Sequence, residues 1–149
     1  MVHILELILK KSYDLILMKT CTVAIEGINT EQGLINCGGS MEAYREVLES
    51  FLEDTGVKIR EFKPLLKRAA KNISDTEMQQ FSRASHAIKG VSAIIGAQDL
   101  SIAAAGLEKA FKSGDRAAMQ ISFPAFYQDL KTTAERVQSF LNNSPNGGI

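Results

Sequence analysis

Apolar residues in most of this chain recur at intervals of three and four, which is the spacing of one face of an α-helix. Between residues 40 and 71 they are Tyr44, Val47, Leu48, Phe51, Leu52, Ile59, Phe62, Leu65 and Leu66. The spacing returns at 76–95, 97–112 and 115–142, with no strand-like alternation. Short connections between such segments favour antiparallel neighbours. We therefore predict an all-α fold, an antiparallel up-and-down four-helix bundle with additional N-terminal helices.

Glycine and proline mark the expected interruptions of these helices. Gly56 and Pro64 fall inside the segment 40–71, which predicts one kinked helix or two helices. Gly96 follows the second segment, where a glycine commonly ends a helix. Asp115 should cap the last helix, and Pro124 predicts a local bend within it.

The chain divides into three parts on this pattern. Residues 1–21 form a separate apolar segment that we expect to be helical, 22–142 hold the bundle, and 143–149 are a frayed tail. Within the second part, the stretch "INTEQGLINCGG" (28–39) predicts a single short helix closed by two glycines.

Composition excludes several classes of function. The 17 basic and 17 acidic residues cancel, there is no polybasic segment and there is no Trp, so we expect no nucleic-acid partner. The only Cys and His residues, Cys21, Cys37, His3 and His86, are too scattered to predict a metal site. Two free thiols suit a reducing compartment and a cytoplasmic location. Charges interrupt the apolar run of residues 3–19, which argues against a membrane span or a signal peptide.

His86 is expected to point away from the core of its own helix. The apolar stripe of that helix consists of Phe81, Ala84, Ile88, Val91 and Ile95. His86 precedes Ile88 by two residues, which places it nearly opposite the stripe because each residue turns a helix by about 100°. Lys89 and Gly90 follow at the third and fourth positions and share its face.

The same face lacks bulky side chains, which indicates a docking surface. Ser82 and Arg83 lie one turn before His86 and Ala93 two turns after it. Gly90 costs a helix interior about 1 kcal/mol relative to alanine, so a glycine there suggests close approach of another molecule. A neutral imidazole has a nitrogen lone pair that can attack phosphorus, and a nearby ammonium would stabilise the phosphoryl group. An ordinary surface histidine is the alternative reading of this spacing.

The stretch "HAIKGVSAIIGAQDL" (86–100) resembles the signature H-x-[LI]-K-G-x-[SA]-x-x-x-G-A-x-x-L of histidine-containing phosphotransfer domains, the HPt modules of multistep phosphorelays. The matching residues are His86, Ile88, Lys89, Gly90, Ser92, Gly96, Ala97 and Leu100. The stretches "LEKAFKSGD" (107–115) and "GLINCGGSMEAYREVLESFLED" (33–54) also resemble this family, and the likeness covers about residues 26–141.

The resemblance implies a role for each matched position. His86 would accept the phosphoryl group on Nε2, Lys89 would help to hold it, and Gly90 would leave room for the partner. Ser92 and Gly96 would pack behind the site. The implied partners are receiver domains of response regulators or hybrid kinases in two-component systems, and the receiver would supply magnesium. The sequence has no nucleotide-binding loop, so we expect a phosphocarrier without a bound cofactor rather than an enzyme.

The N-terminal segment resembles a fragment of a different family. "LELILKKSYDLILM" is similar to the second helix and third strand of a receiver domain, but Lys19 stands where that family has its phosphorylatable aspartate. A remnant of this kind implies descent from a hybrid sensor histidine kinase. We expect residues 3–19 to form a helix that packs on the bundle or mediates a homodimer, with a strand at 13–18 as the alternative.

Two alternative functions and several further polar or tyrosine residues complete the sequence-based expectations. One alternative function is a pseudo-HPt module that docks a receiver without accepting phosphate, and another is an unrelated bundle with a metal or ligand site. Among the remaining polar side chains, we expect Asp99 and Glu108 to support helix ends or surface ion pairs. Further positions expected at the rim of the docking surface or in packing are Gln79, Gln80, Tyr13, Tyr44 and Tyr127.

Overall fold

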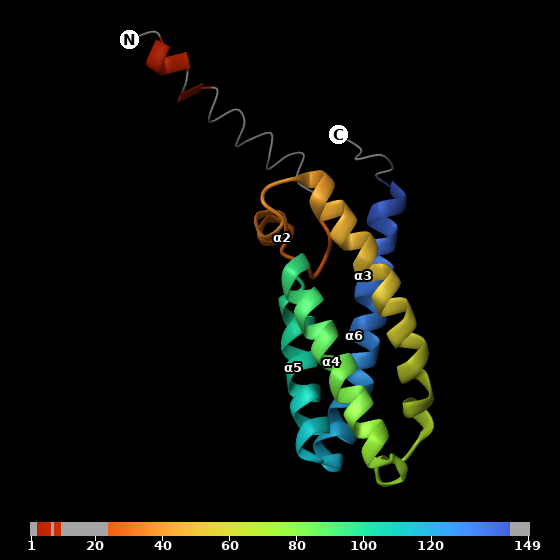
Figure 1. Cartoon of the computed structure of the whole chain (residues 1–149). Coiled ribbons are helices and arrows are strands. Elements are labelled where there is room, and N and C mark those ends of the chain that lie inside the picture. The colour runs from red at the N-terminus through yellow and green to blue at the C-terminus, as the bar shows by residue number, and fades with distance from the viewer. Residues whose placement is uncertain (1–2, 7, 10–23, 144–149) are drawn as a thin grey trace.

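The computed structural model describes residues 3–6, 8–9 and 24–143, and its main body is a helical bundle (Figure 1). The elements are α2 (Thr30–Asn36), α3 (Met41–Phe62), η1 (Lys63–Lys67), η2 (Ala70–Asn72), α4 (Asp75–Ile95), α5 (Gln98–Ser113) and α6 (Arg116–Asn143). Apart from an isolated bridge between Ile25 and Ile28, these described residues contain no β-structure. The predicted all-α fold is therefore confirmed.

The four long helices run up and down around one core (Figure 1). α3 and α5 each pack against α4 and α6, so α3 and α5 lie diagonally across the bundle. The core between them contains fully buried side chains from all four helices, among them Leu48, Phe51, Ile88, Leu107 and Leu130. Aromatic rings contact one another within this core: Phe62 stacks on Phe81 at 5.3 Å between ring centroids and lies 5.7 Å from Phe126.

The first long helix ends earlier than the apolar spacing predicts. α3 runs through Gly56 without a break and stops at Phe62. Pro64 then lies in the first turn of the 3₁₀ helix η1, where its missing N–H leaves no helical hydrogen bond unmade. The expectation of helix up to residue 71 was wrong because this stretch forms η1 and η2 instead. Arg116 ties the segment to α6 by donating to the carbonyl oxygen of Ala70 at 2.6 Å.

Both ends of α4 are fixed by their capping residues. Ser74 accepts a hydrogen bond from the Glu77 backbone N–H at 3.1 Å, and the Glu77 side chain accepts one from the Ser74 N–H at 3.3 Å. This reciprocal pair is a capping box. Gly96 ends the helix in the left-handed region with φ of 91°, as its sequence position predicts.

α2 covers the end of the bundle where α4 finishes (Figure 1). Asn29 donates its backbone N–H to the Gly96 carbonyl at 2.8 Å, and the Tyr44 hydroxyl donates to the Ile95 carbonyl at 2.8 Å. A Cβ atom on Gly33 would collide with that Ile95 carbonyl and with the Tyr44 ring. Glycine is therefore required at position 33 for α2 to sit this close.

The remaining boundaries agree with the sequence to within about one residue. Asp115 accepts the Ala118 N–H at 3.0 Å at the start of α6, and this helix continues through Pro124. The short helix within 28–39 is α2, and Gly38 and Gly39 after it have positive φ. Residues 3–6 and 8–9 are helical, while the expectations for 10–21 and for the tail 144–149 lie outside the described residues. Among the residues described, no helix is both long and apolar enough to span a membrane.

Candidate functional site

His86 lies on the outer face of α4, as the helical spacing predicts. Its side chain is 66% exposed, whereas Ile88, two residues on, is completely buried in the core. The ring is therefore accessible from solvent while its backbone is fixed in the middle of a long helix. A molecule that approaches α4 from outside can reach the imidazole directly.

Glu108 of α5 anchors the His86 ring. The Nδ1 atom of His86 lies 2.8 Å from Oε1 of Glu108, and the Lys89 ammonium donates to Oε2 of the same carboxylate at 2.8 Å. The Glu108 side chain is only 10% exposed, so this contact is shielded from water. Since an ionised carboxylate only accepts hydrogen bonds, Nδ1 carries the proton. In the neutral form of the ring, the other nitrogen, Nε2, then has the free lone pair.

The surroundings of Glu108 keep its carboxylate ionised. The hydrogen bond from Lys89, supported by the one from His86, lowers the pKa of Glu108 below its ordinary value, although burial acts in the opposite direction. Lys112, one turn further along α5, has its ammonium 3.9 Å from Oε1. The site therefore contains a fixed anion with cations on two sides and the imidazole on a third.

Glu108 is the residue of this cluster that sequence reasoning missed. We expected it to support a helix end or a surface pair, but it is buried and joins His86 to Lys89. The sequence places Glu108 within the family-like stretch "LEKAFKSGD" (107–115). Its contact with His86 depends on how α5 is rotated against α4, which the sequence pattern does not give. Asp99, paired with it in that expectation, does lie in the first turn of α5 and is exposed.

Gly90 leaves an open space beside the histidine. It is exposed, and a Cβ atom built on it would have no neighbouring atom within 4 Å. No contact within the described fold therefore requires a glycine at this position. The lack of a side chain here is instead suited to the approach of another molecule.

Ser82 does not belong to this exposed surface, contrary to expectation. It is only 8% exposed, because the buried side of α4 is broader than its apolar stripe and includes small serines. A serine can be buried there at little cost when its hydroxyl bonds to the preceding turn, as Ser85 does with the Phe81 carbonyl at 2.8 Å. Arg83 and Ala93 are exposed, as expected for the proposed rim.

The other matched positions lie behind the site. Ser92 is fully buried, and its hydroxyl has no hydrogen-bond partner among the described residues. The Lys89 carbonyl accepts a hydrogen bond from the Ser101 hydroxyl at 2.9 Å, which pins α5 to α4 beside the site. Tyr44 and Tyr127 are buried core residues, whereas Gln79 and Gln80 are exposed.

α2 extends the exposed face beyond the end of α4. The Asn36 amide donates to the carbonyl oxygen of Ile94 at 3.1 Å, which holds α2 against this end. Ile35 and Ile94 are 61% and 46% exposed. With Ala93 they form exposed apolar surface at the C-terminal end of α4. The contribution of Ile35 depends on the docking of α2, which spacing within α4 does not reveal.

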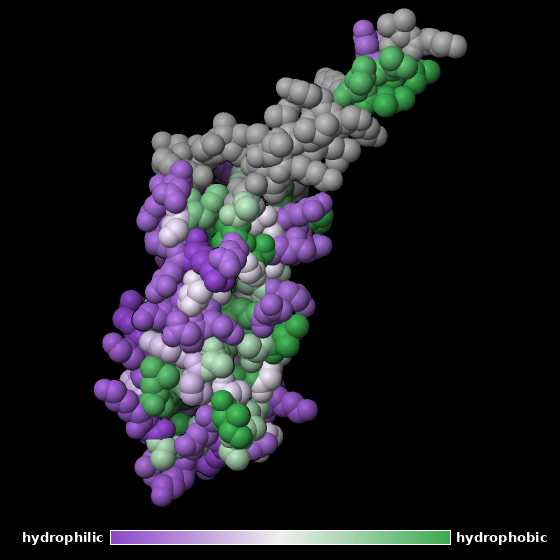
Figure 2. All heavy atoms as spheres, turned by 180° about the vertical axis from the view of Figure 1, so that it is seen from behind, coloured by the Kyte–Doolittle hydropathy of each residue, from purple (hydrophilic) through white to green (hydrophobic). Residues whose placement is uncertain are grey.

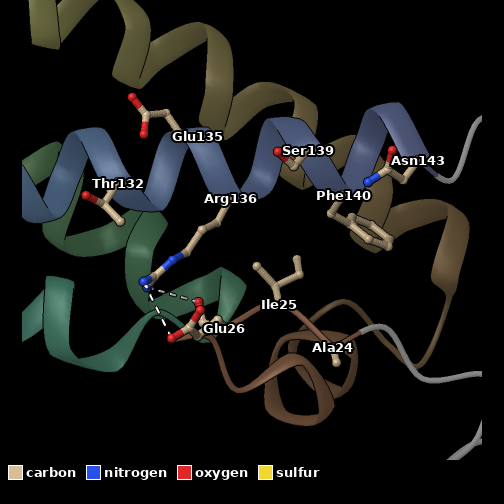
Figure 3. Close-up of a pocket in the computed structure, with 9 residues that line it drawn as sticks. All are labelled: Ala24, Ile25, Glu26, Thr132, Glu135, Arg136, Ser139, Phe140 and Asn143. Carbon is tan, nitrogen blue, oxygen red and sulfur yellow. Dashed lines mark hydrogen bonds and ion pairs between the residues drawn. The ribbon is translucent and has the colours of Figure 1, made fainter.

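A pocket lies away from His86, between residues 24–26 and α6 (Figure 3). Its volume is about 500 Å³, and Arg136 reaches across it to within 3.7 Å of the Glu26 carboxylate. None of the side chains that line it contacts His86 or Glu108. In the described part of the chain, no three His, Cys, Asp or Glu side chains are grouped so that they could hold a metal ion.

Comparison with known proteins gives one match. A family model described as Hpt domain matches residues 46–140, which include the His86 region, Glu108 and most of the bundle. No curated protein and no solved structure gives a significant match to the chain.

Proposed function

Because this chain belongs to the Hpt domain family, we propose that His86 is its phosphoryl acceptor and that the chain carries phosphoryl groups between receiver domains. Hpt domains are histidine phosphotransfer modules of phosphorelays, phosphocarriers that interact with receiver domains. The observation that supports His86 most directly is its exposed ring, bound through Nδ1 to Glu108. This contact directs the other ring nitrogen, Nε2, to act as the nucleophile.

The transfer step follows from this arrangement. The lone pair on Nε2 attacks the phosphorus of an aspartyl phosphate on the partner, and the bond between phosphorus and the aspartate oxygen breaks. The bonding electrons leave with the aspartate, which becomes a free carboxylate. The imidazole gains positive charge as the N–P bond forms, and the Glu108 carboxylate at Nδ1 offsets that charge. Reversal of the same step passes the phosphoryl group to a second receiver.

In this scheme Lys89 binds the phosphoryl group as well as Glu108. It is now bonded to Glu108, and its side chain is 35% exposed. A phosphoryl group on His86 would bring nearly two negative charges to the same turn of α4. The flexible Lys89 side chain can move toward that group and stabilise it, while Gly90 leaves space for the partner's aspartate.

We propose that the module is a passive carrier. The sequence contains no loop for binding nucleotide phosphates, and in-line phosphoryl transfer needs only positioning and charge stabilisation, much of which the receiver and its magnesium would provide. The pseudo-HPt alternative, docking without transfer, remains the second candidate. It is less well supported because an exposed histidine bound to Glu108 and next to Lys89 is the cluster that transfer would use.

Transfer from a charged receiver tests the acceptor. Purified receiver domains charged with acetyl phosphate are mixed with the full chain, and label on the chain is followed over time. His86→Gln should abolish the label, and His3→Gln, which removes the other histidine, should leave it unchanged. Label retained in the His86→Gln protein would identify a different acceptor. Binding of a receiver with no label on the wild-type chain would favour the pseudo-HPt function.

The N-terminal segment bears on the origin of the chain and on its oligomeric state. We infer descent from a hybrid sensor kinase and a homodimer through residues 3–19, because Ile4, Leu5, Ile8 and Leu9 expose 57–64% of their surface. Figure 2 shows the apolar patch that they form. Light scattering on the full chain and on residues 22–149 tests the dimer: the full chain should have twice the monomer mass and the shorter one the monomer mass. Monomer masses for both would contradict it.

A further inference from the structure

The fold separates charges that cancel in the sequence. The formal net charge is zero. On α3, however, acidic side chains outnumber basic ones, and all of the acidic ones are exposed: Glu42, Glu46, Glu49, Glu53, Asp54 and Glu61. α5 lies diagonally across the bundle from α3. The molecule therefore has an acidic side that faces away from α5.

The side that carries His86 is cationic. Between residues 78 and 113, which hold most of α4 and all of α5, the basic residues are Arg83, Lys89, Lys109 and Lys112, and the acidic residues are Asp99 and Glu108. Glu108 is buried and is already engaged by His86 and Lys89. Asp99 lies in the first turn of α5, well away along the helix from Lys112. Four basic residues against two acidic ones leave this stretch with a net positive charge of two, although Lys89 and Lys112 both pair with Glu108.

A groove beside the histidine concentrates these cations. It has a volume of about 470 Å³ and is lined by Lys89, Ala105, Glu108, Lys109, Lys112 and Ser113. It adjoins the proposed acceptor because Lys89 and Glu108 belong to both. Lys109 is exposed, and the Lys112 side chain is 76% exposed. Lys112 lies 3.9 Å from the Glu108 carboxylate, but the exposure of both lysines leaves them open to a docked protein.

We propose that this groove on α5 binds an acidic surface of the receiver domain and sets the orientation in which the receiver docks over His86. The proposal rests on the proposed function and adds to it the kind of partner surface that the module selects. Lys109 and Lys112 act as specificity determinants at the edge of the interface rather than on the phosphoryl group. Receivers that present acidic side chains beside their phosphorylated aspartate are the preferred partners.

The charge separation also explains how orientation is selected before contact. A partner with an acidic patch is attracted to the α5 side and repelled by the acidic α3 side as it approaches. Such steering raises the association rate and is screened by salt, because exposed charges interact weakly beyond a Debye length of about 8 Å at physiological ionic strength. The effect of these lysines should therefore appear in the association rate and depend on ionic strength.

Charge reversal tests the proposal. The receiver used is the one that, among purified acetyl-phosphate-charged receiver domains, labels the wild-type chain fastest. Lys109→Glu/Lys112→Glu should slow this transfer about tenfold or more at low salt, and the difference should shrink to about twofold in 0.5 M NaCl. The matched control Lys71→Glu/Lys131→Glu changes the net charge equally at exposed positions outside the groove, and should stay within about twofold of wild type.

Direct phosphorylation by phosphoramidate separates docking from chemistry. Labelling by this small donor needs no partner surface, so Lys109→Glu alone, which keeps the 3.9 Å contact of Lys112 with Glu108, should match the wild-type chain, as should the control variant. Reversing acidic residues of the receiver to lysine should restore transfer to Lys109→Glu/Lys112→Glu. Equal receiver-dependent transfer by both double variants, or slower phosphoramidate labelling of Lys109→Glu, would overturn the inference. A wild-type chain that neither donor labels would instead overturn the proposed function, and the inference with it.

Discussion

The contact between Glu108 and His86 should hold the ring proton on Nδ1, and a substitution at Glu108 tests this. Glu108→Gln keeps the size of the side chain but removes the charge that holds the proton on Nδ1 and offsets the positive ring. We expect transfer to slow about tenfold or more, and ¹⁵N shifts of the His86 ring to show a smaller Nδ1–H population. Glu53→Gln, which neutralises an exposed glutamate on α3 outside the site and the groove, is the control. Wild-type rate and tautomer in Glu108→Gln would show that the carboxylate does not position the ring.

Gly90 allows stability and function to be separated at one position. A Cβ atom there meets nothing within 4 Å, so Gly90→Ala should stabilise the helix by about 0.5–1 kcal/mol in chemical denaturation. Gly90→Leu should also fold, yet its side chain would occupy the space left for the partner. Receiver-dependent transfer should fall in the leucine variant while phosphoramidate labelling persists. A leucine variant that transfers normally would mean that the partner does not approach over Gly90.

At the scale of elements, the close packing of α2 against α3 and α4 depends on Gly33. Any side chain at this position would meet the Ile95 carbonyl and the Tyr44 ring. Gly33→Ala should therefore destabilise the protein by about 1–3 kcal/mol and lower the hydrogen-exchange protection of α2. Tyr44→Phe removes only the hydroxyl bond to Ile95 and should cost about 1 kcal/mol. Similar losses in the two variants would indicate that close packing of α2 is not what Gly33 provides.

The elements also show how far sequence reasoning reaches. The spans of α4, α5 and α6 follow from local signals, namely apolar spacing, the Ser74 and Asp115 caps and the glycine at 96. The exposure of His86 follows from the same spacing. The contact of Glu108 with His86 does not, because it depends on how α5 is rotated against α4. The burial of Ser82 does not either, because the buried side of α4 is broader than its apolar stripe. The end of α3 at Phe62 has a local signal in Pro64, whereas the contact of Arg116 with the Ala70 carbonyl of η2 is tertiary and is not encoded in local spacing.

At the scale of the whole molecule, two carboxylates make its stability depend on pH. Arg68 hydrogen-bonds the Glu77 side chain, with one contact at 3.0 Å, and this bond, aided by the capping interactions with Ser74, lowers the pKa of Glu77 to about 2. The pKa of Glu108 is also lowered, mainly by Lys89. A glutamate in an unfolded chain has a pKa of about 4.3. Both groups therefore stabilise the fold fully above about pH 4.3, and they lose this contribution as the pH falls.

Glu77→Gln measures this dependence. The glutamine cannot ionise, so the variant lacks the contribution of the charged Arg68–Glu77 pair at every pH. Its Tm should be a few degrees below that of the wild-type chain at pH 6, and the difference should shrink between about pH 4.3 and 2 as the wild-type carboxylate takes up its proton. Glu53→Gln, an exposed change on α3, should show no such convergence. A Tm difference for Glu77→Gln that stays constant from pH 6 to pH 2 would mean that the residue stabilises α4 through its size or its neutral hydrogen bonds. The Arg68–Glu77 ion pair, which links the η1–η2 connection to the start of α4, would then contribute nothing to the stability of the bundle.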